Sequence, residues 1–201
     1  MLYLHRGYLR HFVEQEVIAD MEATFDDRRV LGQLRVAIGF ADLAGFTRFT
    51  EEAGEAEALD LVERFVEAVE ETIPNDARVV KNIGDAVMVV GYDAAALTDW
   101  AIGFQEGFAR RSRPRIGIHF GHTMYRDGDY FGRNVNLAAR VVARAMAGEV
   151  LVTEPVLEEI SADPGLEHEP IGNVRLKGFS EPTALYAVRA AARTDARRGA
   201  R

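Results

Sequence analysis

Two aspartates in this sequence stand where an apolar run meets a turn, a position from which a carboxylate can bind a metal ion. Asp42 ends an apolar run in FADLAGFT, and Asp85 occupies the corner between two β-branched runs in RVVKNIGDAVMVV. In a β-α-β-β arrangement the first strand lies beside the hairpin strands, so we expect the two carboxylates to converge. Magnesium takes few ligands from the protein and the rest from phosphate and water, so the pair fits nucleotide chemistry. From FADLAGFT alone, a role for Asp42 in shaping the turn is an equally good interpretation.

The turn after Asp42 offers backbone groups for an anion. Ala44, Gly45 and Phe46 lead from the strand into a helix. A row of free backbone N–H groups at such a point binds phosphate. The stretch therefore predicts a metal ion and a phosphate held side by side.

The stretch DGDYFGRNVNLAAR first suggests a calcium-binding loop. Asp127, Asp129 and Gly132 fall at the first, third and sixth positions of that pattern. The fifth position is Phe131, and the twelfth is Ala138 where the pattern requires a bidentate glutamate. We reject a calcium site on this ground.

The helix that follows carries polar residues on one face. Asn136 and Arg140 are four residues apart and share that face, which suits a sugar hydroxyl and a phosphate. Arg133 and Arg144 extend the stripe and are interpreted as solvated surface.

His119 and His122 in GIHFGH are the histidines that a metal site would use. Three apart on a strand, they point to opposite faces, so we expect structural roles for them.

Composition excludes several classes of protein. The chain has 201 residues, of which 48% are apolar and none is cysteine, so disulfide scaffolds and thiolate metal sites are excluded. A net charge of −8 argues against a nucleic-acid-binding surface. No run approaches the roughly 20 apolar residues of a membrane helix, and the charged N-terminus is no signal peptide. We therefore expect a soluble, cytoplasmic protein without membrane contact.

The elements that must position these residues follow from periodicity. An amphipathic lead-in helix is expected within residues 1–34, then a strand over 35–43. A helix over 50–74 is expected to be capped by Thr50, with Leu59, Phe65 and Val69 in its buried stripe. Further elements are expected as two strands around the Asp85 corner, a helix over 94–108, a strand over 113–125, a helix over 134–146, a strand and helix over 148–160, and a hairpin over 172–188. This order predicts an α+β, ferredoxin-like fold, a mostly antiparallel sheet with helices on one face.

Four stretches together resemble a known family. FADLAGFT, VKNIGDAV, GDYFGRNVNLAAR and VRLKGFSEP, in this order, resemble the catalytic domain of class III nucleotidyl cyclases, the adenylyl and guanylyl cyclases of bacteria and animals. The resemblance implies a catalytic domain over 35–189, preceded by a helical segment often found in bacterial members. Residues 190–201 are expected to form a disordered tail. The chain would then be the C-terminal piece of a regulated protein or a short stand-alone cyclase.

The resemblance also implies roles for individual residues, and no position departs from the active adenylyl pattern. Asp42 and Asp85, with Leu43, would bind two divalent cations, Mg or Mn. Lys81 and Asp129 would read the adenine edge. Asn136 would orient the ribose, Arg140 would stabilise charge on the α-phosphate, and Lys177 would hold the distal phosphates.

ATP is the expected substrate, and 3′,5′-cyclic AMP and pyrophosphate are the expected products. Adenine presents an acceptor and a donor that match an ammonium and a carboxylate, whereas guanine reverses the pattern. The alternatives are a guanylyl cyclase and a catalytically silent cyclase-like module, which would be expected to have lost site residues. A diguanylate cyclase lacks support because its Gly-Gly-Asp/Glu-Glu-Phe signature is missing, and a P-loop enzyme lacks its Gly-Lys-Ser/Thr turn.

The family pairs two domains head to tail in a homodimer with shared sites. Lys81 and Asp85, four residues apart on one hairpin, would then work in two different sites. In a monomer they would be a surface ion pair worth under about 1 kcal/mol.

Overall fold

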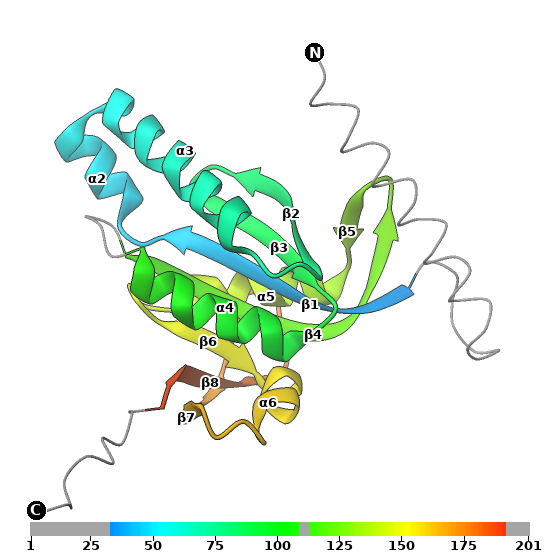
Figure 1. Cartoon of the computed structure of the whole chain (residues 1–201). Helices are drawn as coiled ribbons and strands as arrows, with labels where there is room; N and C mark the ends of the chain where they lie inside the picture. Colours follow the sequence, from blue (N-terminus) through cyan, green and yellow to red (C-terminus); the bar gives the residue numbers. More distant parts are fainter. Residues whose placement is uncertain (1–32, 109–112, 192–201) are drawn as a thin grey trace, which may run out of the picture.

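A computed structural model describes residues 33–108 and 113–191, and in these ranges the strands form one eight-stranded sheet (Figure 1). The strand order is β2-β3-β1-β4-β6-β8-β7, with β5 paired to β4 outside this path. The strands are β1 (Gln33–Leu43), β2 (Ala77–Ile83), β3 (Ala86–Gly91), β4 (Pro114–Arg126), β5 (Asp129–Phe131), β6 (Val150–Thr153), β7 (Leu166–Val174) and β8 (Thr183–Ala190). The helices are α2 (Phe46–Ala53), α3 (Glu55–Thr72), α4 (Ala94–Gly107), α5 (Arg133–Arg144) and α6 (Glu154–Ile160).

Strand β1 lies in the middle of the ferredoxin-like part of the sheet. It pairs antiparallel with β3 on one side and with β4 on the other. Its residues from Val36 to Leu43 are buried and, apart from Asp42, are apolar or glycine, as expected for a strand covered on both faces. All pairings along the path are antiparallel except that of β4 with β6. The predicted α+β fold with a mostly antiparallel sheet is therefore confirmed.

The expectation that helices cover one face is wrong, because α5 packs on the opposite face from α3, α4 and α6. The core between those three helices and the sheet includes Phe65, Trp100 and Ile118. On the other face, Ala138 and Val142 of α5 cover alternate residues of the same strands. The βαββαβ pattern predicts which face of the sheet its two internal helices cover. It makes no prediction for α5, which follows the pattern in the chain.

A glycine allows α5 to approach the sheet closely. A Cβ atom built on Gly117 of β4 would lie 2.3 Å from the backbone nitrogen of Val142. Glycine is therefore required at this position for α5 to pack where it does.

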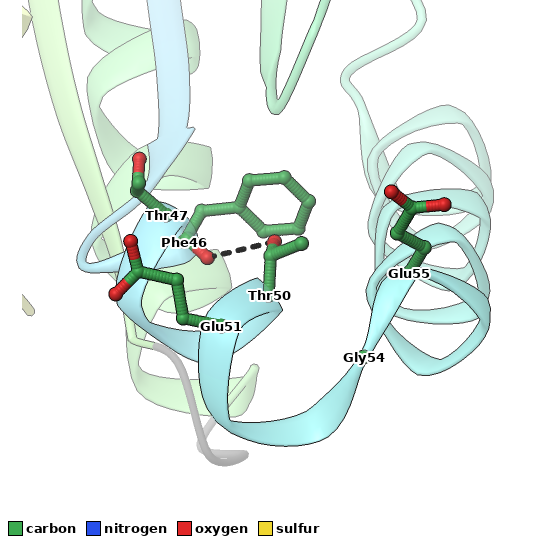
Figure 2. Close-up of a pocket in the computed structure, with 6 residues that line it drawn as sticks. All are labelled: Phe46, Thr47, Thr50, Glu51, Gly54 and Glu55. Atoms are coloured by element: carbon green, nitrogen blue, oxygen red, sulfur yellow. Dashed lines mark hydrogen bonds between the residues drawn. The ribbon is translucent and has the colours of Figure 1, made fainter.

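The first long helix is divided in two. Gly54 has φ 96°, a conformation that favours glycine, and separates α2 from α3. The predicted cap at Thr50 is wrong, because Thr50 lies inside α2 and its hydroxyl donates to the carbonyl of Phe46 (Figure 2). The predicted buried stripe is right at Phe65 and Val69 but wrong at Leu59, which is 61% exposed.

The predicted lead-in helix and C-terminal tail fall almost wholly outside the described residues. Gln33 and Leu34 belong to β1, and Ala190 ends β8. Within the described ranges, no helix has the length and apolar character to cross a membrane.

Candidate functional site

The two aspartates predicted to converge lie together at one end of the sheet. Asp42 is the second-last residue of β1, and Asp85 stands in the turn between β2 and β3. The N–H of Leu43 donates to the carbonyl of Asp85 at 3.3 Å, so the turn is tied to the end of β1. The pKa of Asp85 is raised, first by burial and then by the negative charge of Asp42. The two carboxylates therefore face one another.

An arginine that the sequence did not single out binds Asp42. Arg115 of β4 is directly opposite Asp42 in the antiparallel register. Its Nε and Nη2 atoms donate to Asp42 Oδ2 at 2.7 and 2.5 Å, and its Nη1 donates to the carbonyl of Ala145 at 3.4 Å. Asp42 is only 9% exposed, so its charge is balanced inside the protein by this guanidinium.

The backbone N–H groups after Asp42 differ in part from the prediction. Ala44 is not free, because its N–H donates to the carbonyl of Arg113 at 3.3 Å. Gly45, with φ 76°, and Phe46 stand at the start of α2, where N–H groups have no intrahelical partner. The anion-binding row is therefore shorter than predicted.

Beside this turn, α2 and α3 border a pocket of about 450 Å³. Figure 2 shows its lining residues Phe46, Thr47, Thr50 and Glu51 on α2, with Glu55 at the start of α3 across Gly54. The two exposed glutamates give this pocket a negative rim that does not suit phosphate.

Lys81 pairs with Asp129 and not with Asp85. The Lys81 Nζ atom lies 2.5 Å from Asp129 Oδ2, and both side chains are partly exposed. The other oxygen of Asp129 accepts the N–H of Tyr130 at 2.8 Å. The two residues predicted to read a base edge are therefore adjacent, although they are 48 residues apart in sequence.

The remaining predicted residues are exposed. Asn136 and Arg140 lie on the exposed side of α5, opposite the buried Ala138 and Val142. Lys177 is exposed in the loop between β7 and β8, next to the buried Leu176. In the described parts of the chain, no hydrogen bond or ion pair joins Asp42, Asp85 and Arg115 to Lys81 and Asp129.

Arg133 and His119 each make a contact that bears on the role predicted for it. Arg133 was interpreted as solvated surface, but its guanidinium lies 4.9 Å from the ring centre of Phe179, so it links α5 to the loop that carries Lys177. His119 is buried and pairs its Nδ1 with the hydroxyl of Thr153 at 2.8 Å, which agrees with the predicted structural role.

No group of three or more acids or histidines that could hold a metal ion occurs among the residues that the structure describes. The rejection of a calcium loop is consistent with the geometry, because Asp127 and Gly128, both with positive φ, form a tight hairpin turn between β4 and β5.

Comparisons with known proteins find a family and several relatives that match this chain. The model of the family described as adenylate and guanylate cyclase catalytic domain matches residues 32–190. A pH-sensitive adenylate cyclase of Mycobacterium tuberculosis is 33% identical over 187 residues, 90% of this chain and 47% of that protein. An adenylate cyclase of Streptomyces coelicolor is 38% identical over 139 residues, 67% of this chain and 36% of that protein. The chain thus spans less than half the length of these curated relatives.

Among solved structures, the adenylyl cyclase CyaB from P. aeruginosa is similar, with a TM-score of 0.69 and 26% identity. The match covers 80% of this chain and 96% of that one.

Proposed function

We propose that this chain, which belongs to the family of adenylate and guanylate cyclase catalytic domains, converts ATP into 3′,5′-cyclic AMP and pyrophosphate. The observation that carries the proposal is the pairing of Lys81 with Asp129, because it sets a cationic donor beside an anionic acceptor on an accessible surface. Two relatives described above are named adenylate cyclases, which supports the same choice of nucleotide.

The Lys81 and Asp129 pair keeps the capacity to bind a base. An ammonium has three N–H donors and a carboxylate about four acceptor sites. The mutual bond and the N–H of Tyr130 use only part of this capacity. Adenine offers a ring nitrogen to the ammonium and an amine to the carboxylate, whereas guanine would leave both groups badly paired.

The carboxylates of Asp42 and Asp85 fit a pair of divalent cations, Mg or Mn. The pKa of Asp85 is raised first by burial and then by the negative charge of Asp42, and bound cations would relieve that repulsion. The Leu43 side chain is buried in the core, so only its backbone oxygen is available to join them. When bound, the cations lower the pKa of the ribose 3′-hydroxyl and neutralise phosphate charge.

The reaction needs no side-chain nucleophile. The ribose 3′-oxygen bonds to the α-phosphorus, the bond from that phosphorus to the bridging oxygen breaks, the hydroxyl proton is released, and pyrophosphate leaves. We assign the ribose to Asn136, the charge that grows on the α-phosphate to Arg140, and the distal phosphates to Lys177. All three side chains are exposed and accessible to such a ligand.

We further propose a head-to-tail homodimer in which each site uses both chains. In the described residues, no direct bond joins the metal-site residues around Asp42 to the base-reading pair of Lys81 and Asp129, and this supports the division. Three large apolar side chains are exposed: Ile83 at the Asp42 end of the sheet, and Met124 and Phe131 on the hairpin formed by β4 and β5. A second copy would cover them.

Incubation of the purified protein with ATP or GTP, in Mg²⁺ or Mn²⁺, tests the function by chromatography of the products. We expect cyclic AMP in preference to cyclic GMP, and no product after chelation of the metal. Cyclic GMP as the main product would favour the guanylyl alternative. No product from either nucleotide, with Asp42→Asn as the inactive reference, would favour the silent module.

A further inference from the structure

An irregularity in strand β2 places two cations on one face of the sheet. The register between β2 and β3 shifts between Val79 and Lys81, so that Arg78 faces Val90 and Lys81 faces Met88. Val90 and Met88 both lie in the apolar cluster under α5. Residues opposite each other in an antiparallel pair share a face. Arg78 and Lys81, three apart and on opposite faces of a regular strand, therefore both point to the α5 side.

Arg78 holds the hairpin formed by β4 and β5. Its Nη2 donates to the hydroxyl of Tyr130 at 3.1 Å, and its guanidinium lies 5.2 and 5.4 Å from the ring centres of Tyr125 and Tyr130. Tyr125 and Tyr130 are a cross-strand pair with ring centres 5.0 Å apart. One arginine on β2 thus binds a residue from each strand of the hairpin.

The hairpin carries the acidic member of the base-reading pair. Asp129 is the neighbour of Tyr130 and accepts its N–H. Strand β5 pairs with β4 alone among the described strands, so its attachment to β2 is through side chains. The side-chain contacts between β2 and β5 include those of Arg78 with Tyr130 and of Lys81 with Asp129, at successive positions of β5.

We infer that Arg78 is a positioning residue that sets selectivity for adenine, by fixing the hairpin so that Asp129 stays beside Lys81. This inference rests on the proposed function. Loss of the guanidinium frees the buried ring of Tyr130 to shift, and the Asp129 carboxylate moves with it away from the place where it meets the base amine. The proposed function assigns the phosphates and the ribose to other residues, so we expect the catalytic step itself to change little when Arg78 is replaced.

The variant Arg78→Met tests the inference, because it keeps the length of the side chain without the guanidinium. Binding of 3′-deoxy-ATP and 3′-deoxy-GTP, which lack the attacking hydroxyl, is measured by calorimetry with Mn²⁺. We expect the preference for the adenine analogue to narrow about tenfold, the effect of one lost hydrogen bond to a charged group. In steady state, KM for ATP should rise by a similar factor while kcat stays within about threefold.

Three companion variants complete the test. Arg78→Lys keeps the charge over the rings without the planar donor and should narrow the preference by only about threefold. Tyr130→Phe keeps the packing of the ring and should also narrow the preference for the adenine analogue about threefold. It replaces Arg78→Met as the test variant if Arg78→Met melts below the assay temperature. Arg189→Met is the control. It removes an exposed arginine of β8 that binds Glu167 of β7, and it should leave the ratio of the two analogue affinities unchanged.

The outcomes separate the inference from the function on which it rests. Folded Arg78→Met or Tyr130→Phe with the wild-type ratio of analogue affinities overturns the inference even if cyclic AMP is formed. Wild-type protein that binds the adenine analogue selectively but forms no cyclic product overturns the proposed function, and the altered ratio in Arg78→Met would still support the inference. Wild-type protein without any preference between the analogues overturns both.

Discussion

At the scale of single residues, the pairing of Asp42 with Arg115 changes what a metal-ligand substitution does. Asp42 is buried, and Arg115 donates two hydrogen bonds to it. Asp85 is only partly buried, and its raised pKa means that its carboxyl group ionises less readily in the folded protein than in the unfolded chain. The two aspartates proposed for the same metal site are therefore not equivalent for stability.

We predict that Asp42→Asn and Asp85→Asn both abolish cyclisation but differ in stability. Asp42→Asn removes the buried carboxylate that accepts two hydrogen bonds from Arg115 and should lower the free energy of unfolding by about 1–3 kcal/mol. The pKa of Asp85 is raised in the folded protein, so its ionisation lowers the stability of the fold as pH rises through that pKa. Asp85→Asn removes this effect, and its free energy of unfolding at pH 7 should equal or exceed that of the wild type. Urea unfolding in a metal chelator measures both. Equal losses in the two variants would contradict the asymmetry.

A second prediction concerns His119, whose pKa is lowered by burial, while a hydrogen bond with Asn134 acts in the opposite direction. Below the ordinary pKa of about 6.5, the unfolded chain binds a proton that the folded protein does not, so stability should fall as pH drops from about 7 toward the lowered pKa. His119→Gln removes this titration and should flatten the pH dependence of the melting temperature between pH 7.5 and 5.

The exposed His122 provides the control for that experiment. His122→Gln should leave the wild-type slope unchanged. A slope that flattens in His122→Gln, or that persists in His119→Gln, would show that another group causes it.

The residues proposed for the site come from the motifs, since those around Ile-Gly-Asp and Val-Asn are recognisable in the sequence, and their roles remain predictions. Arg115 was missed because its partner Asp42 is 73 residues away and the contact depends on the register of β1 with β4. The pairing of Lys81 with Asp129 was likewise not predicted, although both residues were. Both omissions concern cross-strand contacts, which a one-dimensional pattern does not fix.

At the scale of elements, the existence and type of the long helices and strands followed from periodicity, but the helix break and the placement of α5 did not. Gly54 in EEAGEAEA was the only indication of the break between α2 and α3. A single glycine can also lie inside an unbroken helix, so the sequence did not distinguish the two cases. The face that α5 covers depends on Gly117, whose missing side chain leaves room for a helix that comes later in the chain.

Gly117→Ala should therefore displace α5. The added Cβ would meet backbone atoms of Val142, which cannot rotate away, so we predict a loss of about 3 kcal/mol in unfolding free energy. Activity should fall further than stability explains, because α5 carries Asn136 and Arg140. Thermal melts and cyclic AMP assays below the melting point measure the two effects.

The matched control is Gly103→Ala in the exposed part of α4, where a Cβ meets no atom within 4 Å. Alanine is more stable than glycine in a helix interior, so the free energy of unfolding of this variant should rise by about 0.5–1 kcal/mol, with unchanged activity. A similar loss in both variants would mean that space at Gly117 is not the cause.

At the scale of the whole molecule, the proposed shared site predicts that two inactive proteins restore activity when mixed. Arg140→Ala should cost on the order of 10²–10³ in turnover, and Asp42→Asn should be at least as severe. In a head-to-tail dimer of one chain of each, one site carries both defects and the other carries neither. Random exchange makes about half the dimers mixed, so roughly a quarter of wild-type activity should return.

Cyclic AMP formation by the exchanged mixture, compared with each variant alone, measures this recovery. A tagged pull-down verifies that subunits have exchanged. Full exchange without recovered activity would assign all the residues to a site within one chain.

The central place of β1 also has a consequence for how the protein is made. The ribosome delivers β1, β2 and β3 well before β4, so one edge of β1 stays open until residues 114–126 have emerged. An open edge in so apolar a strand is a template for pairing with other nascent chains. A gene cut short after α4 should thus yield an aggregating fragment, because both edges of β1 are covered only once the ribosome has delivered β4 to its end.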